Sequence, residues 1–373
     1  MGFQTEVNNQ QAPAVAGDFA TGNPRSVVVA QEGAFVAGVG GVQVGKFAWI
    51  GDDGRTVVNH GTAVNAPDGF VHRDQQALIT EYLGEASNLI PEGFPVTLFR
   101  TGDFYATVGG ATAATKGATV YAKYSDGSVT IGSAATGASA TGAIGSTNTG
   151  LLGATFTASA DTDDTKLVVT SVTGLISVGD EISGTGITAG TLITAQDSGT
   201  PGGAGTYSLD QSNTASAATV TAFGSAVKIT ATTGLISIGD TISGGAGFPV
   251  GATIVSQLSG TTGGAGNYEI SEPGTAYTAS ATGITTFGTV LNITAVASGS
   301  VLVGNPVSGT GVPSGAVIDT QVSGTAGGIG VYTIDVAASA YAASTAITTT
   351  GGVATDWKCS TACAVGELTV ITK

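Results

Sequence analysis

The segment GLISVGDEISG at residues 174–184 returns as GLISIGDTISG at residues 234–244. It returns a third time, more loosely, as GSVLVGNPVSG at residues 299–309. Successive side chains in such a segment alternate between two faces with a period of two, which is the pattern of a β-strand. The motifs Gly-Asp and Gly-Thr-Gly occur every few residues in this region, and such motifs are typical of tight turns. The segment therefore predicts short strands joined by tight turns.

A second segment recurs with the first, and its copies are GGAGTYSL (202–209), GGAGNYEI (263–270) and GGIGVYTI (327–334). The two segments together define three units, at residues 154–222, 223–287 and 288–352. We expect four to six short strands in each unit, arranged as a small sandwich or barrel. The recurring tyrosines are Tyr207, Tyr268 and Tyr332. They are either core or hairpin positions, or aromatic platforms for the sugar rings of a host glycan.

The sequence on either side of the repeats is different in kind. Residues 1–131 hold both histidines, seven of the eleven basic residues and Trp49, and residues 353–373 hold Trp357 and both cysteines. A terminal strand that carries a tryptophan needs a sheet and an apolar core, so we expect residues 353–373 to pair with residues 1–131 in one base domain. The stretch 132–153 is made of small residues and predicts a linker. Residues 75–88 suit either a strand or a helix.

The fold class that follows is all-β. We expect a discontinuous base domain, a sandwich or barrel formed by residues 1–131 and 353–373, and about three small repeated β domains. No helical pattern occurs between residues 154 and 350.

The charge of the chain excludes several partners. Only 10% of its residues are charged, its formal net charge is −15, and no Lys or Arg occurs from Ile229 to Trp357. Binding to a phosphate backbone or an anionic membrane surface needs clustered basic residues, so neither nucleic acid nor a membrane is an expected partner. The N-terminal residues show no secretory signal, and no run of 18 apolar residues occurs, so we expect folding in a cytosol.

The residues that usually carry catalysis are few. Gly40, Gly45 and Lys46 nearly match a phosphate-binding loop, but Phe47 stands where the magnesium-binding hydroxyl is needed. We expect no enzyme activity, no catalytic residue, no cofactor and no metal. Cys359 and Cys363 are either two reduced thiols or a disulfide, and the disulfide requires the chain to turn sharply between them.

Several segments near the two ends resemble the structural cement (capsid decoration) proteins of tailed bacteriophages. They are GDFATGNPRSVVVA (17–30), GVQVGKFAWI (41–50), the stretch 69–106, VYAKYSDGSV (120–129) and DWKCSTACAVGELTVI (356–371). The resemblance implies a non-catalytic homotrimer that is made in the host cytoplasm. It would sit on the outer capsid surface of the virion and contact the major capsid protein. The departure from the family is the insertion at residues 132–352.

The resemblance also suggests where the protein would make contacts. Candidate oligomer and capsid interface residues lie in the family-like stretch, and they are His72, Arg73, Tyr82, Leu89 and Phe94. The acidic repeats would then project outward into water. The alternative is an adhesin-like surface protein whose repeats bind host glycans or proteins.

Overall fold

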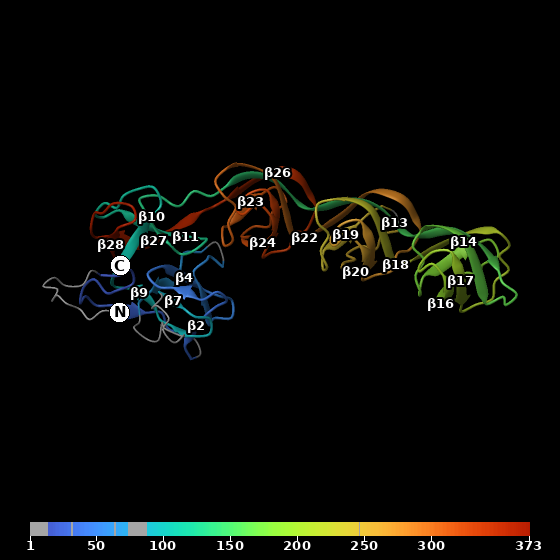
Figure 1. Cartoon of the computed structure of the whole chain (residues 1–373), viewed down its shortest axis with the longest axis horizontal. Coiled ribbons are helices and arrows are strands. Elements are labelled where there is room, and N and C mark those ends of the chain that lie inside the picture. The colour runs from blue at the N-terminus through green and yellow to red at the C-terminus, as the bar shows by residue number, and fades with distance from the viewer. Residues whose placement is uncertain (1–13, 31–32, 63–64, 74–87, 246) are drawn as a thin grey trace, which may run out of the picture.

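The computed structural model describes residues 14–30, 33–62, 65–73, 88–245 and 247–373. These residues contain strands, turns and loops but no helix, so the all-β prediction is confirmed. Figure 1 shows a base that holds the C-terminal end of the chain, and an elongated array of strands that extends from it. The ambiguous stretch 75–88 lies almost entirely outside the described residues.

A seven-stranded sheet forms the lower part of the base. Its strands, in spatial order, are β1 (Ser26–Val27), β9 (Leu98–Thr101), β6 (Gly69–Val71), β4 (Phe47–Ile50), β5 (Thr56–Val58), β2 (Phe35–Ala37) and β8 (Pro95–Val96). A short pair, β3 (Val42–Gln43) and β7 (Leu89–Ile90), lies beside it. Val42, Val71 and Leu98 are fully buried in the core under this sheet.

A closed five-stranded barrel forms the upper part of the base. Its strands, in order around the barrel, are β10 (Asp103–Gly109), β12 (Val129–Ile131), β11 (Thr119–Lys123), β27 (Gly352–Cys359) and β28 (Leu368–Thr372). Strand β28 runs antiparallel to β10, with Asp103 opposite Thr372, and β27 runs antiparallel to β11. The last strands of the chain therefore close a barrel that residues 103–131 begin.

The two parts of the base share one aromatic core. The Trp357 ring lies 6.1 Å from the Phe47 ring and 6.0 Å from the Phe70 ring, both of which belong to the seven-stranded sheet. It also lies 5.9 Å from Phe104 in the barrel. Rings at such separations add a favourable contact to the burial of their area, so Trp357 joins the C-terminal strand to both sheets.

The array is built on one long strand, β13 (Ser139–Ala160), which contains 22 residues. Along its length β13 pairs antiparallel with parts of four other strands, which are β26 (Ala342–Thr349), β22 (Thr278–Ser298), β18 (Ala218–Thr233) and β14 (Lys166–Gly174). At about 3.3 Å per residue such a strand spans roughly 70 Å. Figure 1 shows β13 passing through the whole array from the base to its far end.

The pairings close three successive rings of six strands, which we call the distal, middle and proximal modules. The distal module contains the end of β13, β14, β17 (Gly205–Leu209), β16 (Thr191–Gly199), β15 (Glu181–Gly184) and the first part of β18. The middle module contains the centre of β13, the second part of β18, β21 (Gly266–Ile270), β20 (Ile254–Gly260), β19 (Thr241–Ser243) and the first part of β22.

The proximal module, next to the base, repeats the plan. It contains the start of β13, the second part of β22, β25 (Gly330–Ile334), β24 (Ile318–Gly324), β23 (Val307–Gly309) and β26. Each module has its own apolar core, and each core includes residues of β13. The rings of the middle and proximal modules are each closed by a single bridge, Thr241 with Thr253 and Pro306 with Val317.

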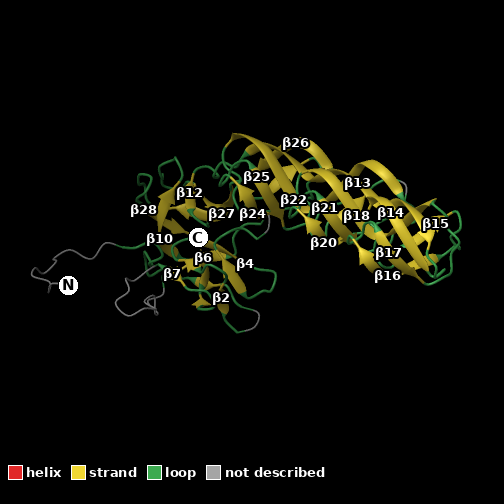
Figure 2. Ribbon diagram, turned by 45° about the vertical axis from the view of Figure 1, so that its right-hand side comes forward, coloured by secondary structure: helices red, strands yellow, loops and turns green. Residues whose placement is uncertain are grey.

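The modules follow one another in space in the reverse of their order in the sequence. The chain first runs out along β13, builds the distal module from the first sequence repeat, and then returns through β18 and β22 (Figure 2). Strand β18 belongs to two modules, β22 belongs to two, and β13 belongs to all three. The array is therefore one continuous hydrogen-bonded body and not a series of separate domains joined by linkers.

The stretch 132–153, which its composition assigned to a linker, is largely structured. Residues 139–153 are the first two thirds of β13. A Cβ atom at Gly145 would lie 1.9 Å from the Thr286 carbonyl oxygen, and one at Gly153 would lie 2.1 Å from the Ala222 carbonyl oxygen. Small residues are needed there because neighbouring strands crowd β13 where it passes from one module to the next.

Candidate functional site

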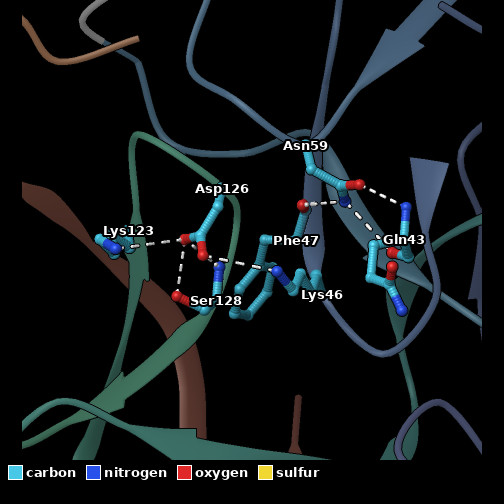
Figure 3. A network of polar contacts seen from close by, with 7 residues as sticks. All are labelled: Gln43, Lys46, Phe47, Asn59, Lys123, Asp126 and Ser128. Atoms are coloured by element: carbon cyan, nitrogen blue, oxygen red, sulfur yellow. Dashed lines mark hydrogen bonds and ion pairs between the residues drawn. The ribbon is translucent and has the colours of Figure 1, made fainter. Parts of the chain in front are cut away.

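A polar network joins the seven-stranded sheet to the barrel (Figure 3). The Asn59 Nδ2 donates to the carbonyl oxygens of Phe47 at 3.0 Å and Gln43 at 3.3 Å, and the Gln43 N–H donates back to Asn59 Oδ1. On the barrel side, Asp126 accepts from the Ser128 hydroxyl at 2.7 Å. Lys46 Nζ lies 3.4 Å from Asp126 Oδ2 and connects the two halves. The network fixes the two parts of the base relative to each other.

The charge balance of Asp126 fits this structural role. Burial by itself would raise the pKa of Asp126, but the Ser128 hydroxyl and the cations Lys46 and Lys123 outweigh it and hold the pKa below its usual value. Gly127 follows with a positive φ of 66°, and its carbonyl accepts from the Phe47 N–H at 2.8 Å. A side chain at this position would collide with the Phe47 carbonyl, so the hairpin tip carries glycine.

The near match to a phosphate-binding loop has a structural explanation here. Gly40, Gly41 and Gly45 all have positive φ angles in turns around β3, and Lys46 is engaged by Asp126. Phe47 begins a strand and not a helix, so no helix N-terminus is present to hold phosphate groups.

Two of the predicted interface residues, His72 and Arg73, pack within the base. The His72 ring stacks on Phe19 with 3.8 Å between centroids, and its Nδ1 lies 2.7 Å from the Gly17 carbonyl oxygen. Arg73 Nη1 lies 3.2 Å from Asp18 Oδ1. Both residues attach the segment 17–19 to the end of β6, and both remain partly exposed.

Two other predicted interface residues, Leu89 and Phe94, reach the surface with 39% and 42% of their areas exposed. Residues on either side of Val39, which is 85% exposed in the turn after β2, contact these two residues. The Ala37 N–H donates to the Phe94 carbonyl, and Gly41 lies against the Leu89 side chain. We call Val39, Leu89 and Phe94 the base patch. The fifth predicted residue, Tyr82, lies outside the described residues.

The recurring tyrosines of the repeats are core residues. Tyr207, Tyr268 and Tyr332 are each at most 1% exposed. Their hydroxyls donate to the carbonyls of Gly203, Gly264 and Gly328 at 2.6–2.7 Å. They are therefore unable to present a ring face to a sugar.

A recurring glutamine that sequence reasoning missed completes each hairpin. Gln257 Nε2 donates to the Thr261 carbonyl at 2.7 Å, and its Oε1 accepts from the Gly263 N–H at 3.0 Å. Gln196 and Gln321 make the same contacts in the distal and proximal modules. The available signal was its spacing, because each glutamine stands six residues before the first glycine of the GGxG segment.

Each module buries one polar side chain at an equivalent turn. Asp180 and Asp240 are 1% and 2% exposed, and each accepts a backbone N–H from the serine three residues earlier. Burial raises the pKa of both carboxyls to about 6. The proximal module has Asn305 at the corresponding position.

The turn that carries Asn305 also contacts the base. A Cβ atom at Gly304 would lie 2.6 Å from the Tyr124 carbonyl oxygen and 3.0 Å from His60 Cβ. The equivalent glycines of the other modules, Gly179 and Gly239, have no atom within 4 Å of such a position. Contacts therefore cross the junction between base and array, in addition to the two strands that connect them.

Among the described residues, no group of three or more His, Cys, Asp or Glu side chains is placed to hold a metal ion. The described part of the chain also contains no helix able to span a membrane.

Residues 3–172 match the family model described as XM1 gp53 minor capsid protein. The matched stretch includes the N-terminal part of the base and continues through β13 into β14. A comparison with curated proteins finds no match. The match supports a structural role in a phage capsid, and with it a location in the virion.

Proposed function

We propose that this protein is a decoration protein that binds the outer surface of a phage capsid through its base and projects its array outward. The observation that carries the proposal is the similarity to a phage minor capsid family over residues 3–172, which include most of the base. Its partners would be the major capsid protein and two further copies of itself. In this role it would have no enzyme activity.

The base patch is the surface that we assign to these contacts. Val39, Leu89 and Phe94 are apolar and exposed, and they come from three neighbouring segments around β2, β7 and β8. Figure 1 shows β2 at the lower edge of the base, on the side opposite the barrel. Clustered apolar side chains on a surface are typical of sites where proteins associate.

The array has properties suited to a projecting element. Residues 154–350 contain two basic residues, Lys166 and Lys228, against twelve acidic ones. Its strands β13, β18 and β22 run continuously from module to module. Arrays with the same negative charge repel one another in water. Continuous strands hold an array at a fixed orientation relative to the base.

The test is an array-less variant bound to capsids that lack the protein. Ala138 and Thr349 are paired where the array begins and ends, because Ala138 N–H donates to Thr349 Oγ1 and Thr349 N–H donates to the Ala138 carbonyl. A short glycine-containing turn can therefore replace residues 139–348. We expect the variant to co-sediment with capsids at the same ratio as the full chain.

Two further measurements make this test sharp. Both tryptophans, Trp49 and Trp357, lie in the base, so their fluorescence reports whether the base is folded. The double substitution Leu89→Asp and Phe94→Asp should abolish co-sedimentation, whereas Val250→Asp on the array should leave it unchanged. A folded array-less base that fails to bind would show that the array forms the capsid interface.

A second candidate function, attachment to a host surface, rests on a cavity of about 510 Å³ between the middle and proximal modules. Phe248 and Phe287 line it together with the hydroxyl residues Thr241, Ser243 and Ser339. Both phenylalanines are partly buried. Aromatic rings that line a cavity beside hydroxyl groups can hold a sugar ring. Loss of cell attachment in a Phe248→Ala variant that still binds capsids would support this role.

A further inference from the structure

The only two cysteines of the chain lie together at the end of the barrel. Cys359 is the last residue of β27, and Cys363 forms an isolated bridge with Ala114. The chain bends at Thr361, between them. A disulfide across so few residues requires such a bend, and the structure supplies it.

Both thiols lie beside the same hydroxyl group, that of Thr369. Cys359 Sγ lies 3.0 Å from Thr369 Oγ1, and Cys363 packs against the same core cluster to which Cys359 belongs. Burial and the neighbouring Cys359 raise the pKa of the Cys363 thiol, while the Thr369 hydroxyl acts in the opposite direction. Each thiol therefore lies within the electrostatic reach of the other.

The two thiols differ in their access to solvent. Cys359 is 2% exposed, whereas Cys363 is only partly buried. A small oxidant can reach Cys363 from outside and cannot reach Cys359. One thiol is thus placed to react first, and the other is placed to complete the reaction from within the core.

We propose that Cys359 and Cys363 form a disulfide when the protein leaves the reducing cytosol, and that this bond locks the C-terminal strand into the base. Both thiols are reduced while the protein folds, because cytosolic thiol buffers keep them so. Release from the cell exposes the virion to low-molecular-weight disulfides and oxygen.

The oxidation balances with a disulfide such as oxidised glutathione as co-reactant. The Cys363 thiolate attacks one sulfur of the co-reactant, its S–S bond breaks, and one glutathione thiolate leaves. The Cys359 thiolate then attacks the Cys363 sulfur of the mixed disulfide, and the second glutathione leaves. The two thiol protons end on the two glutathione molecules, so two protein thiols are oxidised and one small disulfide is reduced.

The bond would cross-link the two ends of the loop 359–363, which connects β27 to the last strand of the chain. The Gly117 N–H donates to the Cys359 carbonyl at 2.7 Å, and the Ala114 N–H donates to the Cys363 carbonyl at 2.9 Å. Strand β28 follows directly and completes the barrel by pairing with β10. A cross-link here restrains the loop that leads into the last strand of the base.

The test uses the purified full chain in oxidised glutathione, followed by alkylation and trypsin. Cleavage after Lys358 and at Lys373 places both cysteines in one peptide, residues 359–373. We expect this peptide to lose both alkylation sites and to be lighter by two hydrogen atoms. The thermal midpoint of the base, followed by tryptophan fluorescence, should rise by at least about 4 °C and return when a reductant is added.

Single substitutions separate the proposed order of events from random oxidation. Cys359→Ser should accumulate glutathione on Cys363, whereas Cys363→Ser should remain largely unmodified because Cys359 is buried. Equal modification of the two variants would overturn the proposed order. A wild-type peptide that keeps glutathione or both free thiols, or that links two chains, would overturn the proposed disulfide.

Discussion

At the scale of single residues, the repeats carry buried carboxyls that do not favour folding at neutral pH. The Asp180 carboxyl accepts a hydrogen bond from the Ser177 N–H, and the Asp240 carboxyl accepts one from the Ser237 N–H. A carboxylate removed from water with a single donor loses more solvation than it regains, and this raises its pKa to about 6. The proximal module avoids the charge by using Asn305.

We predict that Asp240→Asn stabilises the array at pH 8 by roughly 1–2 kcal/mol. The folded pKa lies above the unfolded value of 3.8, so the folded state binds the proton more tightly. The aspartate therefore lowers stability as pH rises through about 6, and the asparagine does not. Thermal unfolding of the array should show the gain at pH 8 and its disappearance towards pH 4.

The control for this prediction is Asp319→Asn, because Asp319 is an exposed residue of β24. That substitution should change the unfolding midpoint little at either pH. A gain for Asp240→Asn that is equal at pH 4 and pH 8 would mean that burial of the charge is not its cause.

At the scale of elements, β13 decides how the modules are connected. The pairing of β13 with β22 is interrupted between Ile144 and Ser146, where four residues of β22 have no partner in β13. The pairing of β13 with β18 is interrupted in the same way between Leu152 and Ala154. Gly145 and Gly153 occupy these two positions with φ angles of 74° and 73°. Each glycine lets the strand step from one ring to the next without breaking its remaining pairs.

We predict that Gly145→Ala destabilises the array by about 3 kcal/mol or more, because the new methyl group meets the Thr286 backbone and the strands must separate. Gly251→Ala is the matched control, since Gly251 has a similar φ of 80° but open space around it. The control should cost only about 1 kcal/mol. Denaturant unfolding measures both values, and amide exchange near Thr286 should rise in Gly145→Ala alone.

At the scale of the whole molecule, the chain enters the array through the proximal module, reaches the distal module and returns. The distal module is therefore the part that can be removed without interrupting the other two. The distal module lies between Leu152 in β13 and Val227 in the middle of β18, and these two residues pair with each other. Removal of residues 154–223 leaves a four-residue loop between these two residues, which is a common hairpin length. The third sequence repeat, by contrast, lies between the base and the rest of the array.

We predict that deletion of residues 154–223 gives a folded, shorter protein that retains the middle and proximal modules. Deletion of residues 288–350 should instead prevent folding of the array, because the start of β13 loses β22 and β26 together. Small-angle scattering and calorimetry distinguish the two products. Equal tolerance of both deletions would mean that the repeats fold independently.

Local patterns predicted the strands of this protein. Alternation with a period of two, glycine-rich turns and absence of a helical pattern led to the all-β class, which depends on neighbouring residues alone. The recurrence of Tyr207, Tyr268 and Tyr332 pointed to equivalent positions, of which a core site was one interpretation. Residues close in sequence carry this information because backbone preference and side-chain direction are local properties.

The tertiary structure decided which strands are shared and which residues meet. Small residues have the same composition in a flexible linker and in a crowded strand, so β13 is recognised only once Thr286 and Ala222 are seen beside it. The reversed order of the modules, the burial of Asp180 and Asp240, and the meeting of Cys359 and Cys363 around Thr369 also depend on distant partners. Strand pairing joins residues over a hundred positions apart, and periodicity along one segment does not specify its partner.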